Sequence, residues 1–507
     1  MKKNFAWAMV MVASLLFISC ENDDSEAPTL FMVTISSSEG GTTNASTGEY
    51  ASGTLLNLTA TPNQGYVFEN WSGDVSGTLA KLSVTVEDDM TIVANFALDE
   101  IAEEPDEKIA FINENLIDTS GYIFAIENGG KTCFLMDHLG AVVHEWTFEL
   151  SLGQDAELTP EGNLIGLFKG DTSPVNFGGQ SGILREIDPQ GNVLWEYTII
   201  TEDEIAHHDF TQMPNGNLLV LVWYRISNEE AVAVGLNNTD DVFVEKVIEL
   251  NPDTNAVVWE WKSWDHIVQD HNNTLASFGD PEIEKEKINI LYANNGVHQF
   301  VELGDLIHFN GIAYYPEKDI IALSANFYSE VWLIDHSTTT SEAATDTGGQ
   351  FNKGGRLLYR FGNQKVYGDN NASSTLNFNH HPSFIETNDA LSLLIYNNNN
   401  AIEQSRAMEF LLPELTSTTT IGVEPSLLFD FTDEDLYFGR VSGAVRLPNG
   451  NTLICEGDYG YWEVTASGEL AWKYNGQGQN FWRGLYYTAD SETIQNLAAR
   501  SNSFKAK

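Results

Sequence analysis

Short stretches of alternating apolar and polar residues, each introduced by a turn, recur along most of the chain. One recurring unit joins a turn to an apolar strand, and it reads LTPEGNLIGLF from 158, QMPNGNLLVLV from 212, YYPEKDIIALS from 314, IETNDALSLLI from 385 and RLPNGNTLICE from 446. A Pro-x-Gly-Asn core is typical of a tight turn between two antiparallel strands. The pattern therefore predicts a chain built from β-hairpins.

A second recurring unit is a turn followed by a short strand with a planar residue at its centre. It reads GAVVHEW, GNVLWEY, NAVVWEW, GRLLYRF, SLLFDF and GELAWKY, and alignment places six residues in one column: His144, Trp195, Trp259, Tyr359, Phe429 and Trp472. One unit cannot cover its own apolar face, so such repeats close into a ring. Six copies predict an all-β fold with a six-bladed β-propeller, and we interpret the column as packing between blades.

The propeller is expected to span residues 111–490 and to be followed by a C-terminal tail at 491–507. Its first blade lacks a turn unit of its own, so the segment FWRGLYYT from 481 is expected to help close it. Long insertions at 262–300 and 337–353 interrupt the repeats. Insertions of this length usually cover a binding face or act as lids.

A small β module is expected ahead of the propeller, over residues 30–97. Its sequence GGTTNASTGEYASGTLLNLTATPNQGYVFENWSGDVSG, followed by VTVEDDMTIVANF, resembles the internalin-type B repeat of bacterial surface proteins. That resemblance implies a spacer or contact module without chemistry of its own. Residues 98–110 contain LDEIAEEPDEK, which is typical of an acidic linker.

The first residues are typical of an export signal. Lys2 and Lys3 precede an apolar run that is too short to span a bilayer. The segment LFISC, ending at Cys20, resembles a bacterial lipobox, which implies a signal peptide at 1–19, a lipid anchor on Cys20 and a polar tether at 20–29. The expected location is the cell envelope, on the outer membrane, facing the periplasm or the surface. An ordinary signal peptide with a spare thiol is the alternative.

Charge restricts the partners. The formal charge of −48, from 73 acidic and 25 basic residues, repels polyanions and argues against nucleic acid as a partner. An anionic substrate would need a locally positive site. Two further cysteines, Cys133 and Cys455, are expected to be buried thiols rather than a disulfide.

Polar residues stand six positions before each repeat proline or its equivalent, where the innermost strand of each blade begins. They are Gln154, His208, Asn310, His381 and Ser442, and His207, His308 and His380 lie beside them. Inner strands line the axial channel, so these residues are expected to converge on one channel mouth. The alternatives are polar residues of a wet channel, or a zinc or copper site. Against a metal, only His208 has a neighbouring carboxylate, that of Asp209.

The order of motifs also resembles one family. HHDFTQMPNGNLL, LIHFNGIAYYPE, LSANFYSEVWLID, FNHHPSFIET, SRAMEF and SGAVRLPNGNTLICEG occur in the order found in the bacterial aryl-sulfate sulfotransferases, over residues 115–490. The resemblance implies an exported six-bladed propeller that transfers a sulfuryl group from an aryl sulfate to a phenol. It also implies a sulfated histidine intermediate, no nucleotide donor and no cofactor.

Carried onto this sequence, the resemblance places the nucleophile on His381. His308 and Asn310 match the family's His-x-Asn motif, and His208, or else His207, matches the early His-His-Asp segment. A neutral imidazole is a competent nucleophile, and a second histidine can protonate the departing phenolate.

The remaining expected substrate-binding residues are Asn326, His380, Arg440 and Ser442. Asn326 stands where the family usually has an arginine, and its loss removes a strong donor to a sulfate ester. Arg406 and Arg440 are candidates to replace it. The alternative function is therefore a divergent or non-catalytic ligand-binding propeller at the cell envelope.

Overall fold

The computed structural model describes residues 29–63, 66–98, 108–293, 298–368, 373–387 and 390–505. The chain divides into two compact units, residues 1–106 and 107–507. The expected signal peptide, Cys20 and nearly all of the tether lie outside the described residues. Within the described ranges, no helix is both long and apolar enough to cross a membrane.

The first unit is a small β module with two sheets. One sheet has the strand order β3 (Gly48–Ala51), β1 (Leu30–Ser37), β7 (Met90–Leu98) and β5 (Tyr66–Gly73), and the other has β2 (Gly41–Thr43), β4 (Leu55–Pro62) and β6 (Lys81–Thr85). Apolar residues at alternate positions of these strands form its core around the buried ring of Trp71. Alternation of this kind places every second side chain on one face of a strand.

The second unit contains six larger antiparallel sheets among its described residues, which we number as blades in chain order. Blade 1 has β11 (Val142–Thr147), β10 (Thr132–Met136), β9 (Gly121–Glu127) and β34 (Phe481–Thr488); blade 2 has β12 (Leu152–Leu158), β13 (Leu164–Lys169), β14 (Gly182–Ile187) and β15 (Val193–Thr198); blade 3 has β16 (Glu204–Gln212), β17 (Leu218–Ile226), β18 (Val242–Asn251) and β19 (Ala256–Lys262). Blade 4 has β22 (Phe309–Tyr315), β23 (Ile320–Ala325), β24 (Glu330–Asp335) and β25 (Tyr359–Phe361); blade 5 has β26 (His380–Thr387), β27 (Ala390–Asn397), β28 (Arg406–Leu411) and β29 (Ser426–Phe431); blade 6 has β30 (Gly443–Arg446), β31 (Thr452–Glu456), β32 (Gly460–Val464), β33 (Leu470–Asn475) and β8 (Ile109–Ile112).

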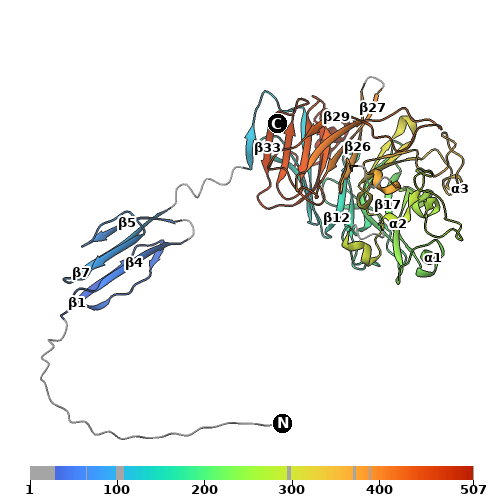
Figure 1. Cartoon of the computed structure of the whole chain (residues 1–507). Coiled ribbons are helices and arrows are strands. Elements are labelled where there is room, and N and C mark those ends of the chain that lie inside the picture. Colours follow the sequence, from blue (N-terminus) through green and yellow to red (C-terminus); the bar gives the residue numbers. More distant parts are fainter. Residues whose placement is uncertain are drawn as a thin grey trace, which may run out of the picture. The chain divides into compact units, whose positions relative to one another are not determined.

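The innermost strands of these sheets touch their neighbours in a closed cycle, in the order β12, β16, β22, β26, β30, β34 and back to β12. The C-terminal strand β34 pairs with β9 of blade 1, which confirms that the segment from 481 closes the first blade. In Figure 1 the light-blue strand β8 lies beside the red strand β33, with which it pairs. The all-β propeller class predicted from the repeats is confirmed.

The aromatic column lies on the outer strands and packs as expected. The indole of Trp472 is fully buried and donates to the backbone oxygen of His138, and the indole of Trp259 donates to Thr338. Cys133 and Cys455 are both buried free thiols, so the expectation that they form no disulfide is confirmed.

Helices are few and short in the described part of the chain. They are α1 (Asn228–Ala233), α2 (Ile290–Ala293), α3 (Thr340–Ala343) and α4 (Glu492–Arg500). The first long insertion also carries the paired strands β20 (Ile267–Val268) and β21 (Ile288–Asn289). The C-terminal end of this insertion, from residue 298, lies close to the channel.

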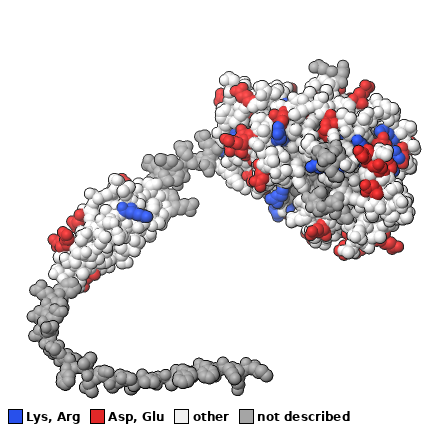
Figure 2. All heavy atoms as spheres, viewed as in Figure 1, with Lys and Arg blue, Asp and Glu red and all other residues white. Residues whose placement is uncertain are grey.

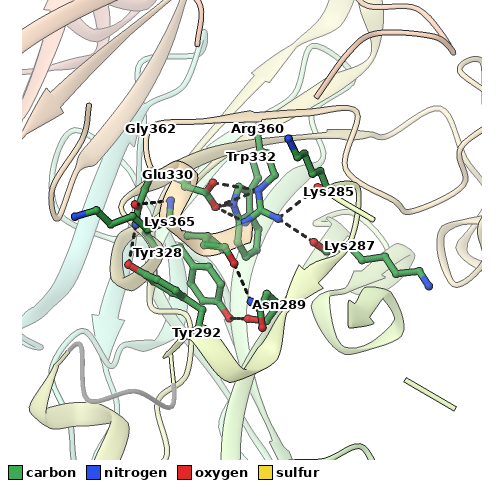
Figure 3. Close-up of polar contacts among 12 residues, drawn as sticks. Lys285, Lys287, Asn289, Tyr292, Tyr328, Glu330, Trp332, Arg360, Gly362 and Lys365 are labelled. Atoms are coloured by element: carbon green, nitrogen blue, oxygen red, sulfur yellow. Dashed lines mark hydrogen bonds and ion pairs between the residues drawn. The ribbon is translucent and has the colours of Figure 1, made fainter. Parts of the chain in front are cut away.

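A buried ion pair fastens this insertion to blade 4. Arg360 pairs with Glu330, and both side chains are inaccessible to solvent. The same guanidinium donates to the backbone oxygen of Lys287 at 2.8 Å, and Tyr328 donates to that of Asn289 (Figure 3). Because a buried charge needs both its counter-ion and its hydrogen bonds, the insertion is held firmly in place.

Candidate active site

A cavity of about 270 Å³ lies where the innermost strands begin, and we call it the mouth cavity. Its lining includes four imidazoles (His208, His298, His308, His380), four aromatic rings (Phe300, Phe327, Phe378, Trp482) and the polar side chains of Asn128, Gln154, Asn326, Asn400 and Arg440. The first long insertion supplies His298 and Phe300. This insertion therefore covers part of the ring face at which the innermost strands begin.

The backbone at these strand starts departs from regular geometry. Positive φ angles occur at His208 (48°), His308 (60°), His381 (53°) and Ser442 (82°). Strand pairing also shifts register at this level, for example between His380 and Ser383. A β-bulge redirects side chains, and strained φ values concentrate at functional sites. These irregularities decide which neighbouring residue faces the cavity.

His380 lines the mouth cavity, and its Nδ1 atom is engaged by Asn398. The amide nitrogen of Asn398 donates to the carbonyl oxygens of Phe438, at 2.7 Å, and Val441, at 3.2 Å. The amide oxygen of Asn398 is therefore the acceptor facing His380 Nδ1 at 2.7 Å, so Nδ1 carries the proton and Nε2 keeps its lone pair. Burial lowers the pKa of His380 to about 3, which leaves the ring neutral at pH 7.

His308 is oriented by a carboxyl group. Its Nδ1 lies 2.5 Å from Asp305 Oδ2, and its ring stacks on Phe327 with centroids 4.6 Å apart. Burial lowers the pKa of His308 to about 3 and raises the pKa of Asp305 well above its usual range. The expectation that no carboxylate accompanies His308 is wrong, because Asp305 reaches it from three residues upstream.

His208 lies between two other imidazoles. Its ring centroid is 4.5 Å from that of His308, and its Nδ1 lies 2.9 Å from Nδ1 of His207. His207 does not line the mouth cavity but stacks behind it on Trp223, at 3.8 Å. Burial, and then the neighbouring imidazoles, lower the pKa of His208 well below its usual range. Asp209 does not contact this ring and pairs with Arg483 instead.

Two of the expected polar residues, Asn310 and Asn326, hold the backbone next to His380. The amide groups of Asn310 and Asn326 both donate to the carbonyl oxygen of Asn379, the residue before His380, at 3.0 and 3.1 Å. Asn326 also lines the mouth cavity, whereas Asn310 is fully buried away from it. Ser442 is buried as well and accepts from the backbone of Gly457.

A cation does reach the mouth cavity. Arg440 is exposed, lines the cavity and lies over the ring of Phe438 at 5.7 Å, and no ion pair involves it among the described residues. Arg406, the other candidate, pairs with Asp430 on the adjacent strand β29 and lies outside the lining. Figure 2 shows acidic patches spread over the visible face, with basic patches among them.

His381 lines a different cavity, of about 220 Å³, farther along the same strands. Four strands each send one residue to the mouth cavity and the next residue to this second cavity: Gln154 and Asp155, His208 and Asp209, His380 and His381, Trp482 and Arg483. Successive side chains of a strand point in opposite directions, which explains the division. The structure therefore separates His381 from His208, His308 and Arg440.

Arg483 is the buried cation of the second cavity. It pairs with Asp209 at 2.8 Å and Asp155 at 3.5 Å, and it donates to the backbone oxygen of Asn310 at 2.9 Å. The side chain of His381 lies beside it with an unpartnered Nδ1 atom. Burial first, and then the charge of Arg483, lower the pKa of His381 well below its usual range.

No group of three His, Cys, Asp or Glu side chains in the described ranges is arranged to hold a metal ion. The sequence interpretation missed several residues of the site: His298, Asp305, Asn398, Trp482 and Arg483. Of these residues, only Asp305 could have been found from the sequence, because it precedes His308 by three positions.

The fold and the cavity together define a β-propeller protein with a histidine-rich pocket at the mouth of its channel. The arylsulfotransferase (ASST) family model matches residues 86–419, and the chain belongs to this family. The model of the divergent InlB B-repeat domain matches residues 31–100. Membership of the arylsulfotransferase family supports aryl sulfotransferase function in general terms. No curated protein matches the chain.

Solved structures give distant matches only. A β-propeller domain of Cps50 (Swd1) from Myceliophteria thermophila has 11% identity, covers 75% of this chain and 97% of its own, and gives a TM-score of 0.32. The periplasmic gluconolactonase PpgL of Pseudomonas aeruginosa has 9% identity, covers 73% and 99%, and gives 0.37. Dihydro-heme d1 dehydrogenase NirN has 8% identity and a TM-score of 0.32; the match covers 71% of this chain and spans 64% of that protein. We draw no functional conclusion from these similarities.

Proposed function

We propose that this protein transfers a sulfuryl group from an aryl sulfate to a phenolic acceptor through a covalent intermediate on His380. The observation that carries the proposal is the fixed tautomer of His380, which leaves Nε2 unprotonated on a ring that lines a cavity with aromatic walls. Aryl rings fit such walls, and Arg440 offers a charge-assisted donor to the sulfate. His381 was the residue favoured by the sequence, but it lines the other cavity.

The reaction divides into two displacements. In the first, His380 Nε2 attacks sulfur while the bond to the aryl oxygen breaks, and His308 or His208 protonates the departing phenolate. In the second, the same group takes the proton of the incoming phenol as its oxygen attacks the sulfated histidine. Dividing one difficult transfer into two easier ones is the usual benefit of a covalent intermediate.

The decisive experiment is mass spectrometry of the purified protein after exposure to 4-nitrophenyl sulfate without an acceptor. We expect one added sulfuryl group on the peptide that contains residues 380 and 381, present in His381→Gln and absent in His380→Gln. A sulfuryl group that is still added in His380→Gln but not in His381→Gln would show that His381 is the nucleophile.

Asn326 favours a second candidate, a propeller that binds aryl sulfates without turning them over, because this amide replaces a permanently charged donor. This protein would retain an aryl sulfate at equilibrium and acquire no label. Equal binding by the wild type and His308→Ala, with no sulfation of either, would support it.

We further propose that Cys20 is acylated and anchors the protein at the cell envelope, on the basis of the Lys-rich start and the LFISC segment. Metabolic labelling with a fatty acid should mark the wild type and not Cys20→Ala. Equal labelling, or none, would contradict the anchor.

A further inference from the structure

A second buried carboxyl group lies behind Asp305. Glu245 on β18 is fully buried, and its Oε1 accepts from the backbone nitrogen of Phe309 at 3.0 Å and from the indole of Trp223 at 3.1 Å. β18 and the Asp305 segment run side by side, since Phe243 and Asp305 form a parallel bridge. The two carboxyl groups are therefore neighbours behind the wall of the mouth cavity.

Each carboxyl keeps one oxygen without a hydrogen-bond partner, namely Glu245 Oε2 and Asp305 Oδ1. Neither forms an ion pair with lysine or arginine in the described part of the chain. Burial, and then the proximity of Asp305, raise the pKa of Glu245 well above its usual range. Two unpaired buried carboxyl groups resist being ionised together, so the pair retains protons at neutral pH.

The titratable groups around this pair are phenols and imidazoles: Tyr224 and Tyr328 lie within electrostatic range of Glu245, and His207, His208 and His298 lie within range of His308. Burial raises the pKa of both phenols and lowers the pKa of the imidazoles. Only His308 has a direct contact with the pair, at its Nδ1 atom. A proton can therefore pass between Asp305 and the cavity through one ring.

We propose that Glu245 and Asp305 form a carboxyl pair that stores the proton exchanged by His308 during sulfuryl transfer. This inference rests on the proposed function and deepens it, because it makes Glu245 a positioning residue that acts through Asp305. It also gives a reason for the two carboxyl oxygens without hydrogen-bond partners, because burying such oxygens lowers the stability of the fold.

The proton balance closes without solvent. In the first displacement, His380 Nε2 bonds to sulfur as the sulfur–oxygen bond breaks, and the phenolate oxygen takes the Nε2 proton of His308. Asp305 then passes its proton to His308 Nδ1, and the resulting carboxylate accepts a hydrogen bond from protonated Glu245. In the second displacement, the acceptor hydroxyl returns its proton to His308 Nε2, the Nδ1 proton goes back to Asp305, and the sulfuryl group leaves His380.

The test compares two donors in wild type and Glu245→Gln. The 4-nitrophenolate group departs without a proton, whereas the phenolate from phenyl sulfate needs one. Glu245 is protonated, so Glu245→Gln removes no charge but replaces an acidic O–H donor to the Asp305 carboxylate with a weaker amide donor. Asp305 should then ionise at higher pH. We expect Glu245→Gln to slow phenyl sulfate at least tenfold more than 4-nitrophenyl sulfate, and to move the alkaline limb of the phenyl sulfate profile to higher pH by about one unit.

Glu456→Gln is the matched control. Glu456 is also buried, and it accepts from the indole of Trp462 at 2.8 Å and from the backbone of Tyr437 at 3.1 Å, but it has no contact with His308. Glu456→Gln should slow sulfuryl transfer from phenyl sulfate and from 4-nitrophenyl sulfate by the same factor. If Glu245→Gln fails to fold, Asp305→Asn is measured with the same two donors and should show the same selective loss.

The outcomes separate the two proposals. Suppose that Glu245→Gln slows both sulfate donors by the same factor as Glu456→Gln does, with no shift of the alkaline limb. That result would overturn the proposed role of the carboxyl pair and leave the proposed function standing. A wild type that transfers sulfuryl groups from neither donor would overturn the proposed function and, with it, the role of the pair.

Discussion

His380 Nδ1 lies 2.7 Å from the side-chain oxygen of Asn398, and this contact fixes the imidazole in one tautomer. Asn398 is itself held in one orientation, because its nitrogen donates to two backbone oxygens. Asn398, directly after β27 (Ala390–Asn397), thus determines which nitrogen of His380 carries the proton. The hydrogen bond made by one ring nitrogen commonly decides which chemistry the other nitrogen can perform.

Asn398→Leu should reduce the rate of His380 sulfation by about 10- to 100-fold, because the ring would no longer be held with Nε2 unprotonated. Asn398→Asp should retain more activity, since a carboxylate still accepts from Nδ1. The added negative charge would raise the pKa of His380, so the acidic limb of activity should move to higher pH. A pH profile of single-turnover sulfation checks both; full activity of Asn398→Leu would remove the tautomer argument.

Arg440 should bind the sulfate group of the donor. Arg440→Ala is expected to raise KM for 4-nitrophenyl sulfate by about tenfold or more, because a charge-assisted hydrogen bond contributes about 1.5 to 3 kcal/mol. Arg406→Ala is the control: it removes the same charge from the protein but breaks only the contact with Asp430. Steady-state kinetics at fixed ionic strength would detect the difference. Equal KM values for the two variants would show that Arg440 is not the clamp.

Gly179 makes room for His208. A Cβ atom at Gly179 would stand 1.8 Å from the imidazole, and its φ of +96° also disfavours other residues. Gly216 shares the positive φ, at +84°, but a Cβ there would meet nothing within 4 Å. Both Gly→Ala variants should lose about 1 kcal/mol of stability from the backbone. Only Gly179→Ala should also lose sulfuryl transfer, about 100-fold if His208 takes part. Equal activity of the two variants would place His208 outside the reaction.

The repeated turns were sufficient to predict the strands, the packing of the aromatic column and closure by the segment from 481, because these depend on local periodicity. They did not predict which histidine faces the cavity. The sequence spacing aligned His381 with His208, but the bulge of β16 between Ala206 and Phe210 is one residue longer than the bulge of β26 between His380 and Ser383, so His380 lines the mouth cavity instead. A bulge adds a residue without leaving a clear signal in the pattern.

Contacts between distant segments were also beyond the sequence. Asn398 reaches His380 from the end of the next strand, and Arg483 comes from the last strand of the ring. Asp305 was missed for a different reason: it belongs to an insertion that lies outside the repeat alignment. A functional residue in an irregular segment has no equivalent position in the other blades, so the repeat alignment cannot identify it.

His336 should make stability depend on pH. Its Nδ1 lies 2.6 Å from Asp319, and its Nε2 lies 3.3 Å from Glu249. Burial alone would lower the pKa of His336, but hydrogen bonding to Asp319 and the negative charges of Asp319 and Glu249 raise it to about 9. Because the unfolded value is about 6.5, the contribution is complete below about pH 6.5 and is lost as the pH rises through 9.

Urea unfolding at pH 6 and pH 10 would measure this contribution. Wild type should exceed His336→Gln by about 2 to 3 kcal/mol at pH 6, and the difference should nearly vanish at pH 10. Comparison with the variant removes the effect of other groups that titrate over this range. A difference that stays constant between the two pH values would mean that the protonated imidazole contributes nothing.

Arg483 should stabilise the propeller through its buried pairs with Asp209 and Asp155. Arg483→Gln would leave two carboxyl groups without a cation, at a cost of about 3 to 5 kcal/mol. The cost should shrink at low pH, because burial, and then the charge of Asp209, raise the pKa of Asp155 well above its usual range, so that the Asp155 carboxyl group becomes neutral. Arg185→Gln is the control: it breaks a pair with the exposed Glu196, which contributes at most about 1 kcal/mol. Urea unfolding at pH 5 and pH 8 separates the two variants. An equally small loss for both variants would mean that the buried pairs of Arg483 contribute little to the stability of the folded protein.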